Sequence, residues 1–167
     1  MPLHSKIVDP FNAQIKSEFS ASAQYIAIAV YFDEMGLEDL AGFFYRQSEE
    51  EREHAMKFVH FMLESEAKPL IPSVPELRNS FDSPSEAVQF ALEQERKVTA
   101  EINNLVDIAI RESDHAANSF LQWFVVEQVE EIDTMSSLLQ TIKLAGDNLL
   151  LVEDYVRRKP QHADEGA

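Results

Sequence analysis

Residues 38–65 read EDLAGFFYRQSEEEREHAMKFVHFMLES, and the spacing of side chains within this stretch decides the fold. Steps of three and four residues follow one face of an α-helix, and here they pick out Leu40, Phe44, Gln47, Glu51, His54, Phe58 and Phe61. The face is apolar toward both ends, but its centre carries a carboxylate and an imidazole. The stretch therefore predicts a long helix that turns two metal-ligand side chains toward the core.

Three other segments repeat this pattern of an acid within an apolar face. Their faces consist of Phe11, Ile15, Glu18, Ser22, Tyr25, Ala29 and Phe32; of Val88, Leu92, Glu95, Thr99, Ile102 and Val106; and of Phe124, Glu127, Glu131, Thr134, Leu138 and Ile142. Each of four long helices is thus predicted to carry at least one carboxylate among the side chains that face the core.

Helix-start and helix-stop signals set the boundaries of these elements. Asp9-Pro10 and the capping box from Ser83 to Glu86 are typical of helix starts, and Gly36 is typical of a helix end. We expect helices at about residues 10–36, 38–65, 84–112, 115–145 and 148–158, followed by a polar tail over residues 160–167.

The connections predict how the helices pack. The turns near residues 36 and 113 are tight, so each joins an antiparallel pair, whereas a proline-rich stretch of about twenty residues separates the two pairs. We therefore predict an all-α single domain over residues 1–167: a four-helix bundle of two hairpins joined by one long crossover, with a short fifth helix. Hairpins stacked in another way would keep the helices without requiring a shared site.

Composition limits the possible functions. The 167 residues include no Cys, which excludes disulfide frameworks, thiolate zinc sites, iron–sulfur clusters and a cysteine nucleophile. A net charge of −16 disfavours nucleic acid as a partner and favours cations. No stretch approaches the ~20 apolar residues of a membrane span. We expect a soluble, cytoplasmic protein with neither a membrane nor a nucleic-acid partner.

The interior acids fall at one level of the predicted bundle. Adding 77 to the residue number carries Glu18 to Glu95, Glu50 to Glu127, Glu51 to Gln128, Glu53 to Glu130 and His54 to Glu131. The two hairpins are therefore predicted to be related by a pseudo-twofold axis, each offering ligands at the same height. Because burying one unpaired carboxylate costs several kcal/mol, four at one level require a cationic partner.

The donor types favour particular metals. Oxygen ligands with one imidazole and no sulfur suit iron or manganese better than copper(I) or a structural zinc. Two divalent ions would neutralise Glu18, Glu51, Glu95 and Glu131, and Glu51 can bridge them with its two oxygens. The Glu51-x-x-His54 spacing places both groups on one helix face, as di-iron carboxylate bundles require.

On these residues the chain resembles the non-haem ferritins of bacteria, over essentially the whole length from Phe11 to Arg158. The matching stretches are Glu18 with Tyr25, Glu50-Glu51-Arg52-Glu53-His54, Glu95, and Phe120-Leu121-Gln122-Trp123-Phe124-Val125-Val126-Glu127-Gln128-Val129-Glu130-Glu131. The resemblance implies a ferritin-like bundle that oxidises Fe(II) with dioxygen or peroxide. It also implies storage of the Fe(III) oxo-hydroxide mineral inside a homo-oligomeric cage of 24 subunits, with the fifth helix at the fourfold axes.

The resemblance also implies roles for individual residues. Glu18, Glu51 and His54 would hold the first iron, Glu51, Glu95, Gln128 and Glu131 would hold or flank the second, and Glu50, Glu127 and Glu130 would form a third position. Tyr25 would supply an electron or hydrogen-bond a bound oxygen species; the alternative is a core tyrosine with a satisfied hydroxyl. Trp123 is expected to be a packing residue.

One departure and one alternative bear on these expectations. Bacterioferritins repeat Glu-x-x-His in the fourth helix and place a haem-ligating methionine after the bridging glutamate, whereas this chain has Arg52 there, so we expect no haem. A di-iron enzyme that reduces peroxide or dioxygen without storing mineral would use the same ligands. A purely structural bundle would leave four interior acids without a counter-charge.

Overall fold

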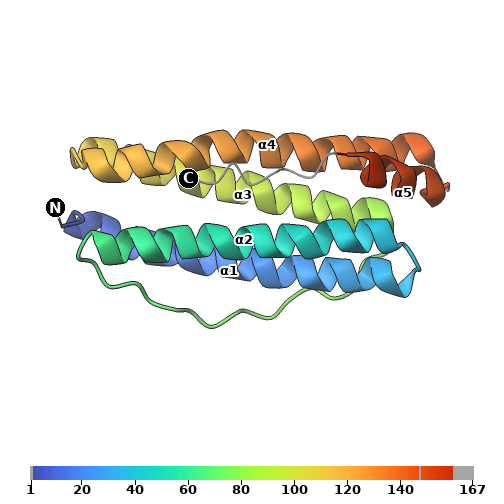
Figure 1. The fold of residues 1–167 in the computed structure, drawn as a ribbon, viewed down its shortest axis with the longest axis horizontal. Coiled ribbons are helices and arrows are strands. Elements are labelled where there is room, and N and C mark those ends of the chain that lie inside the picture. The colour runs from blue at the N-terminus through green and yellow to red at the C-terminus, as the bar shows by residue number, and fades with distance from the viewer. Residues whose placement is uncertain (1, 147, 160–167) are drawn as a thin grey trace.

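The fold, taken from a computed structural model, is described for residues 2–146 and 148–159 and is built of α-helices (Figure 1). The helices are α1 (Ser5–Glu34), α2 (Glu38–Glu64), α3 (Pro84–Arg111), α4 (His115–Ala145) and α5 (Leu149–Arg158). The predicted all-α bundle with a short fifth helix is therefore confirmed. The predicted polar tail, residues 160–167, lies outside the described residues. None of the described helices combines the length and the apolar character that crossing a bilayer requires.

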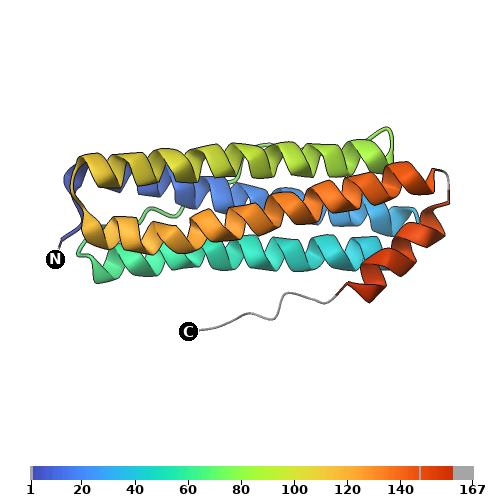
Figure 2. The same cartoon turned by 90° about the horizontal axis from the view of Figure 1, so that it is seen from above.

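The four long helices form two antiparallel hairpins that lie side by side. α1 packs along α2, α3 packs along α4, and α1 also contacts α3, while α5 folds back against α2 and α4 (Figures 1 and 2). Residues 65–83 run the full length of the bundle along α1, so that α2 and α3 begin at the same end (Figure 1). This chain path is the predicted one, with a single long crossover, and it brings all four long helices around one interior.

Local signals end and start the helices where expected. Gly36 adopts φ +75°, and the N–H of Leu37 donates to the carbonyl of Phe32 at 3.0 Å, as in a left-handed C-terminal cap. The Ser83 hydroxyl accepts from the Glu86 N–H at 3.1 Å at the start of α3. Asp114 caps α4 by accepting from the Ala117 N–H at 3.0 Å.

The start of α1 corrects the sequence prediction. We expected the helix to begin at Pro10, but it begins at Ser5 and Pro10 lies inside it. Tertiary contacts outweigh the missing proline N–H: Ile7 is fully buried, the His4 N–H donates to Asp114 at 3.0 Å, and the Lys6 ammonium donates to Glu112 at 3.0 Å. The first turn of α1 is thus held by the turn between α3 and α4.

The crossover is tied to α1 by two amide side chains. Asn12 accepts from the Leu70 N–H at 2.7 Å, near the beginning of the segment. Gln24 makes two hydrogen bonds to the backbone of Arg78, accepting from its N–H at 3.0 Å and donating to its carbonyl at 2.7 Å. These bonds satisfy backbone groups that have no helical partner and hold the long connection against the bundle.

The hydrophobic core is divided into two clusters along the bundle. One cluster, around Phe32 and Phe44, lies at the end where α5 folds back. The other, around Phe11 and Phe58, lies at the end where α3 turns into α4. Between them the buried side chains are polar, so the middle of the bundle is the place where burial must be balanced by other interactions.

α5 is half buried within the chain. Val152 and Val156 pack into the core, whereas Leu150 and Leu151 remain exposed. The Glu153 carboxylate is buried and accepts from the backbone N–H groups of Asp39 at 3.1 Å and Leu40 at 2.7 Å. It thereby satisfies N–H groups in the first turn of α2, whose own N-cap residue supplies no side-chain bond.

We predict that Gln24→Met loosens the crossover, since methionine keeps the volume but cannot bond the Arg78 backbone. Loss of these two part-buried hydrogen bonds should lower the free energy of unfolding by about 1–3 kcal/mol. Thermal unfolding and limited proteolysis, with cleavage sites identified by mass spectrometry, measure the effect. An unchanged rate of cleavage within residues 65–83 would contradict the prediction.

Candidate metal centre

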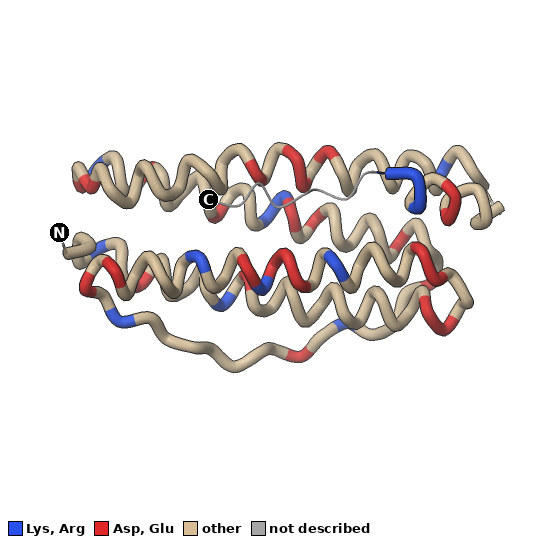
Figure 3. The backbone as a smooth tube through the Cα atoms, viewed as in Figure 1, with Lys and Arg blue, Asp and Glu red and all other residues tan. Residues whose placement is uncertain are grey.

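A buried polar layer lies at the middle of the bundle, between the two hydrophobic clusters. It contains side chains from all four long helices, each at most 4% exposed: Glu18, Glu51, His54, Glu95, Gln128 and Glu131. No Lys or Arg is buried among the described residues. Figure 3 shows acidic residues gathered near the middle of α2 and α4. The prediction that the acids face the interior is therefore confirmed.

One candidate group joins α1 and α2. Glu18, Glu51 and His54 each offer a ligand atom, and these atoms all lie within 4.8 Å of one another. His54 Nδ1 lies 3.1 Å from Glu51 Oε2. Two ligand atoms that each lie about 2.1 Å from the same metal ion are separated by about 3.0–3.4 Å, so this spacing suits two ligands of one ion. Glu18 Oε2 and Glu51 Oε1 are buried without a hydrogen-bond partner in the described part of the chain. Unpartnered buried carboxylate oxygens are the atoms that a cation would satisfy.

A second candidate group shares His54 and reaches α4. It consists of His54, Glu127 and Glu131, again with ligand atoms within 4.8 Å of one another. His54 Nε2 lies 3.9 Å from Glu127 Oε1. Glu127 is half-buried, so this group opens toward the outer side of α2 and α4. Two adjacent groups that share an imidazole are suited to neighbouring metal positions.

Glu95 is held differently from Glu18. Its Oε1 accepts a hydrogen bond from the Tyr25 hydroxyl, and its Oε2 accepts from Gln128 Nε2 at 3.2 Å. Gln128 Nε2 also lies 3.1 Å from the Thr99 hydroxyl. The structure thus places Gln128 beside Glu95 as a donor, and it places the Tyr25 hydroxyl on a carboxylate. Tyr25 matches the alternative of a core tyrosine with a satisfied hydroxyl.

The remaining predicted residues lie around the layer. Glu50 accepts from Gln47 Nε2 at 3.2 Å, and its charge acts on Glu131. Glu130 is exposed on α4. The Trp123 ring packs edge-on against His54, with centroids 5.4 Å apart, and the Lys57 ammonium lies 4.5 Å from the Trp123 ring centroid. Trp123 therefore packs directly against a candidate ligand.

Sequence analysis missed one buried amide at this level, Gln14, and placed a second, Gln47, on the core-facing side of its helix without assigning it a contact. Gln14 donates to Glu18 Oε1 at 2.8 Å. Gln47 Nε2 donates to Glu50, whereas its buried Oε1 has no hydrogen-bond partner within residues 2–146 and 148–159. Each amide lies four residues before a candidate ligand, Glu18 or Glu51, on the same helix face. A search for donors one turn away from each acid would have found Gln14.

Burial and mutual repulsion raise the affinity of the layer for protons. Burial, followed by the charges of Glu95 and Glu18, raises the pKa of Glu51 well above its usual value. Burial and the charge of Glu95 do the same to the pKa of Glu131. Burial also raises the pKa of Glu95, although the Tyr25 hydroxyl opposes the shift. The metal-free layer therefore resists full ionisation, and a divalent cation would relieve this resistance.

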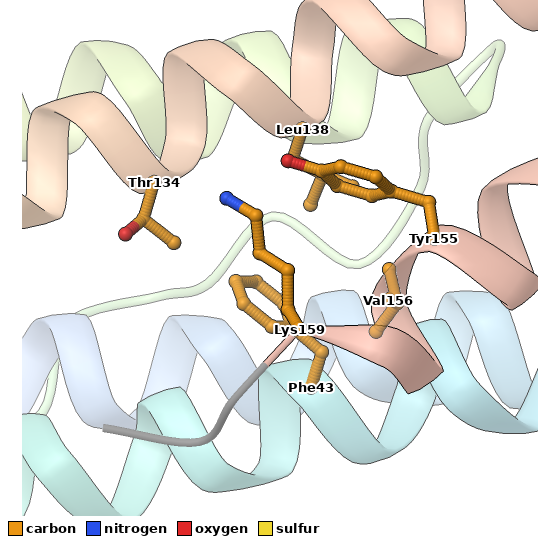
Figure 4. Close-up of a pocket in the computed structure, with 6 residues that line it drawn as sticks. All are labelled: Phe43, Thr134, Leu138, Tyr155, Val156 and Lys159. Carbon is orange, nitrogen blue, oxygen red and sulfur yellow. The ribbon is translucent and has the colours of Figure 1, made fainter. Parts of the chain in front are cut away.

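A narrow pocket lies elsewhere, between α2, α4 and α5 (Figure 4). Its lining residues are Phe43, Thr134, Leu138, Tyr155, Val156 and Lys159. They include no carboxylate or imidazole, and the one charged group, Lys159, points its ammonium toward Thr134 and Tyr155 (Figure 4). The pocket does not have the donors that a divalent cation needs.

The fold and the polar layer together define a four-helix bundle built around carboxylate and imidazole side chains from facing helices. Residues 8–145 match the family description "Ferritin-like domain". The chain belongs to the ferritin family.

Relatives and solved structures agree with this assignment. The chain is 47% identical to Ferritin BfrB of Mycolicibacterium smegmatis over 87% of this chain and 81% of that protein. It is 33% identical to a bacterial non-heme ferritin of Staphylococcus saprophyticus over 87% of each. An open pore ferritin from the archaeon Archaeoglobus fulgidus superposes with a TM-score of 0.91 at 33% identity, covering 95% of this chain and 99% of that chain.

We predict that the metal-free protein loses stability as pH rises above the ordinary carboxyl pKa of 4.5. The pKa values of Glu51, Glu95 and Glu131 are raised in the folded chain, so the folded state binds more protons than the unfolded state in this window. Each such carboxyl contributes up to about 1.4 kcal/mol per pH unit. Denaturant unfolding of metal-free protein between about pH 5 and 8 measures the slope.

Two variants of equal net charge distinguish the contribution of the buried layer to this pH dependence from that of exposed acids. Glu51→Gln should flatten the pH slope, because it removes one buried acid. Glu64→Gln removes an exposed acid and should leave the slope unchanged. Equal slopes in both variants would mean that the layer does not cause the pH dependence.

Proposed function

We propose that this ferritin binds Fe(II) at the polar layer, oxidises it with dioxygen or peroxide, and stores the Fe(III) oxo-hydroxide product inside a cage of 24 subunits. The observation that carries the proposal is the convergence of four buried acids and His54 from facing helices, where Glu18 Oε2 and Glu51 Oε1 have no hydrogen-bond partner among the described residues. Such oxygens need a cation, and the relatives named as ferritins indicate which one.

The residues supply binding, charge and position for the reaction. Glu18, Glu51 and His54 bind the first Fe(II), and Glu51, Glu95, Glu131 and Gln128 bind or flank the second. Two Fe(II) ions give one electron each, which with two protons reduce dioxygen to hydrogen peroxide. Fixed carboxylates stabilise the Fe(III) product, because the higher charge interacts more strongly with them. Tyr25 and Gln128 orient Glu95 through their hydrogen bonds to its two oxygens.

Glu50, Glu127 and Glu130 form a third iron position in this proposal. Glu127 contacts His54, and Glu50 is linked to the layer by Gln47. Burial decreases along the acids of α4: Glu131 of the polar layer is buried, Glu127 is half-buried and Glu130 is exposed. This gradient offers Fe(III) a path of increasing hydration from the centre to the surface of α2 and α4.

Assembly follows from surfaces that one chain leaves uncovered. Leu144, Leu150 and Leu151 are 78%, 76% and 57% exposed at the end of the bundle where α5 lies. Contacts between copies would bury them, which favours a homo-oligomer. We also propose that the assembled protein is cytoplasmic. It binds no haem in this proposal, because Arg52 stands where a bacterioferritin has its haem-ligating methionine.

The first test adds excess Fe(II) in air to metal-free protein, followed by size-exclusion chromatography and iron analysis of the protein peak. A storage ferritin should retain many tens of iron atoms per chain in a particle of cage size. An iron content that stops rising at about two atoms per chain, in a smaller particle, would instead indicate the alternative di-iron redox enzyme.

We predict that Glu18→Ala slows the initial oxidation of Fe(II) by at least about tenfold, because one ligand of the first position is lost. The rate is followed by absorbance of the Fe(III) product, and assembly by size-exclusion chromatography. Glu64→Ala, at an exposed position, is the matched control and should oxidise iron at the unaltered rate. Loss of assembly in Glu18→Ala would show that the layer has a structural role instead.

A further inference from the structure

Gln14 is a buried amide to which the ligand assignment gives no role. It is 2% exposed on α1, and its Nε2 donates to Glu18 Oε1 at 2.8 Å. An apolar side chain of similar size would avoid the free-energy cost of burying an amide. The hydrogen bond to Glu18 is the contact that explains why an amide lies there.

This hydrogen bond makes the two oxygens of Glu18 unequal. Oε1 accepts from Gln14, whereas Oε2 is buried and has no hydrogen-bond partner in the described part of the chain. A carboxylate with two free oxygens can bind a cation through either one or both. With Oε1 held by an amide N–H, Glu18 presents one oxygen to the group that it forms with Glu51 and His54.

The second hairpin lacks this arrangement. The position 77 residues after Gln14 is Ala91, a buried residue that cannot donate a side-chain hydrogen bond. Glu95, the counterpart of Glu18, instead accepts bonds on both oxygens, from Tyr25 and Gln128. The two acids at corresponding positions therefore differ in how many oxygens are available, and on α1 it is Gln14 that reduces the number from two to one.

We propose that Gln14 is a positioning residue that limits Glu18 to one ligating oxygen. The inference rests on the proposed function, since it concerns the same metal position. Restricting a carboxylate to one oxygen lowers the coordination number, so a position at the ion stays open for water or an oxidant. Hydrogen-bond donors behind ligating carboxylates commonly set ligand orientation in this way.

Co²⁺ bound to the metal-free, full-length protein is the probe. Its visible absorption bands weaken as the coordination number rises, so they report how many oxygens Glu18 contributes. In Gln14→Met, which keeps the volume but removes the donor, we expect weaker absorption per bound Co²⁺. Affinity for the first Co²⁺ per chain should also fall about tenfold.

Gln24→Met is the matched control, because it makes the same substitution at another buried glutamine of α1. Gln24 bonds the crossover and not the polar layer, so this variant should lose stability while its Co²⁺ spectrum stays unchanged. If circular dichroism shows that Gln14→Met does not fold, Gln14→Ala is the second test variant. The same spectral change is expected for it.

The outcomes distinguish the inference from the proposed function. Unchanged band intensity per bound Co²⁺ in the Gln14 variants would overturn the inference even if affinity falls, since a packing defect alone can weaken binding. A failure of the unaltered protein to bind Co²⁺ would overturn the metal centre itself, and the inference with it. A spectral change in Gln14→Met that is absent in Gln24→Met supports the positioning role.

Discussion

Four carboxylates buried at one level of a helical bundle form the constraint on which the rest of this structure depends. Glu18, Glu51, Glu95 and Glu131 are each at most 4% exposed, and no Lys or Arg is buried among the described residues. Their burial is unfavourable by itself. A hydrophobic cluster on each side of the layer along the bundle stabilises the helices around it. The helices are long because each one contributes to both clusters and to the layer between them.

The 77-residue offset between the two hairpins joins positions of different chemistry, so the centre has unequal halves. Glu18 and Glu95 are counterparts in sequence, but Glu18 keeps one oxygen without a partner in the part of the chain that the structure describes, whereas both oxygens of Glu95 accept hydrogen bonds. The counterpart of His54 is Glu131, so the single imidazole lies on one side. Because His54 belongs to both candidate ligand groups, it joins the inner position to the more exposed Glu127. This inequality suits the proposed binding, oxidation and directional release of iron.

Segments outside the bundle are held by side chains that satisfy backbone groups. Gln24 bonds the Arg78 backbone in the crossover, and Glu153 of α5 bonds the first turn of α2. Both arrangements use a buried polar side chain where a helix or loop leaves N–H or C=O groups without a partner. The crossover and α5 are therefore held by side chains that do not belong to the polar layer.

The helices, the cap at Ser83 and the inward direction of the acids were predictable from sequence, because each depends on residues three or four positions apart. The start of α1 was not, since the contacts of Ile7 and His4 with distant segments outweigh the local signal at Pro10. Sequence also did not indicate that Tyr25 bonds Glu95 across hairpins, or that Gln14 holds one oxygen of Glu18. Periodicity determines which face a side chain occupies, whereas its hydrogen-bond partner depends on which helix lies opposite and at what height, and only the packed bundle decides that.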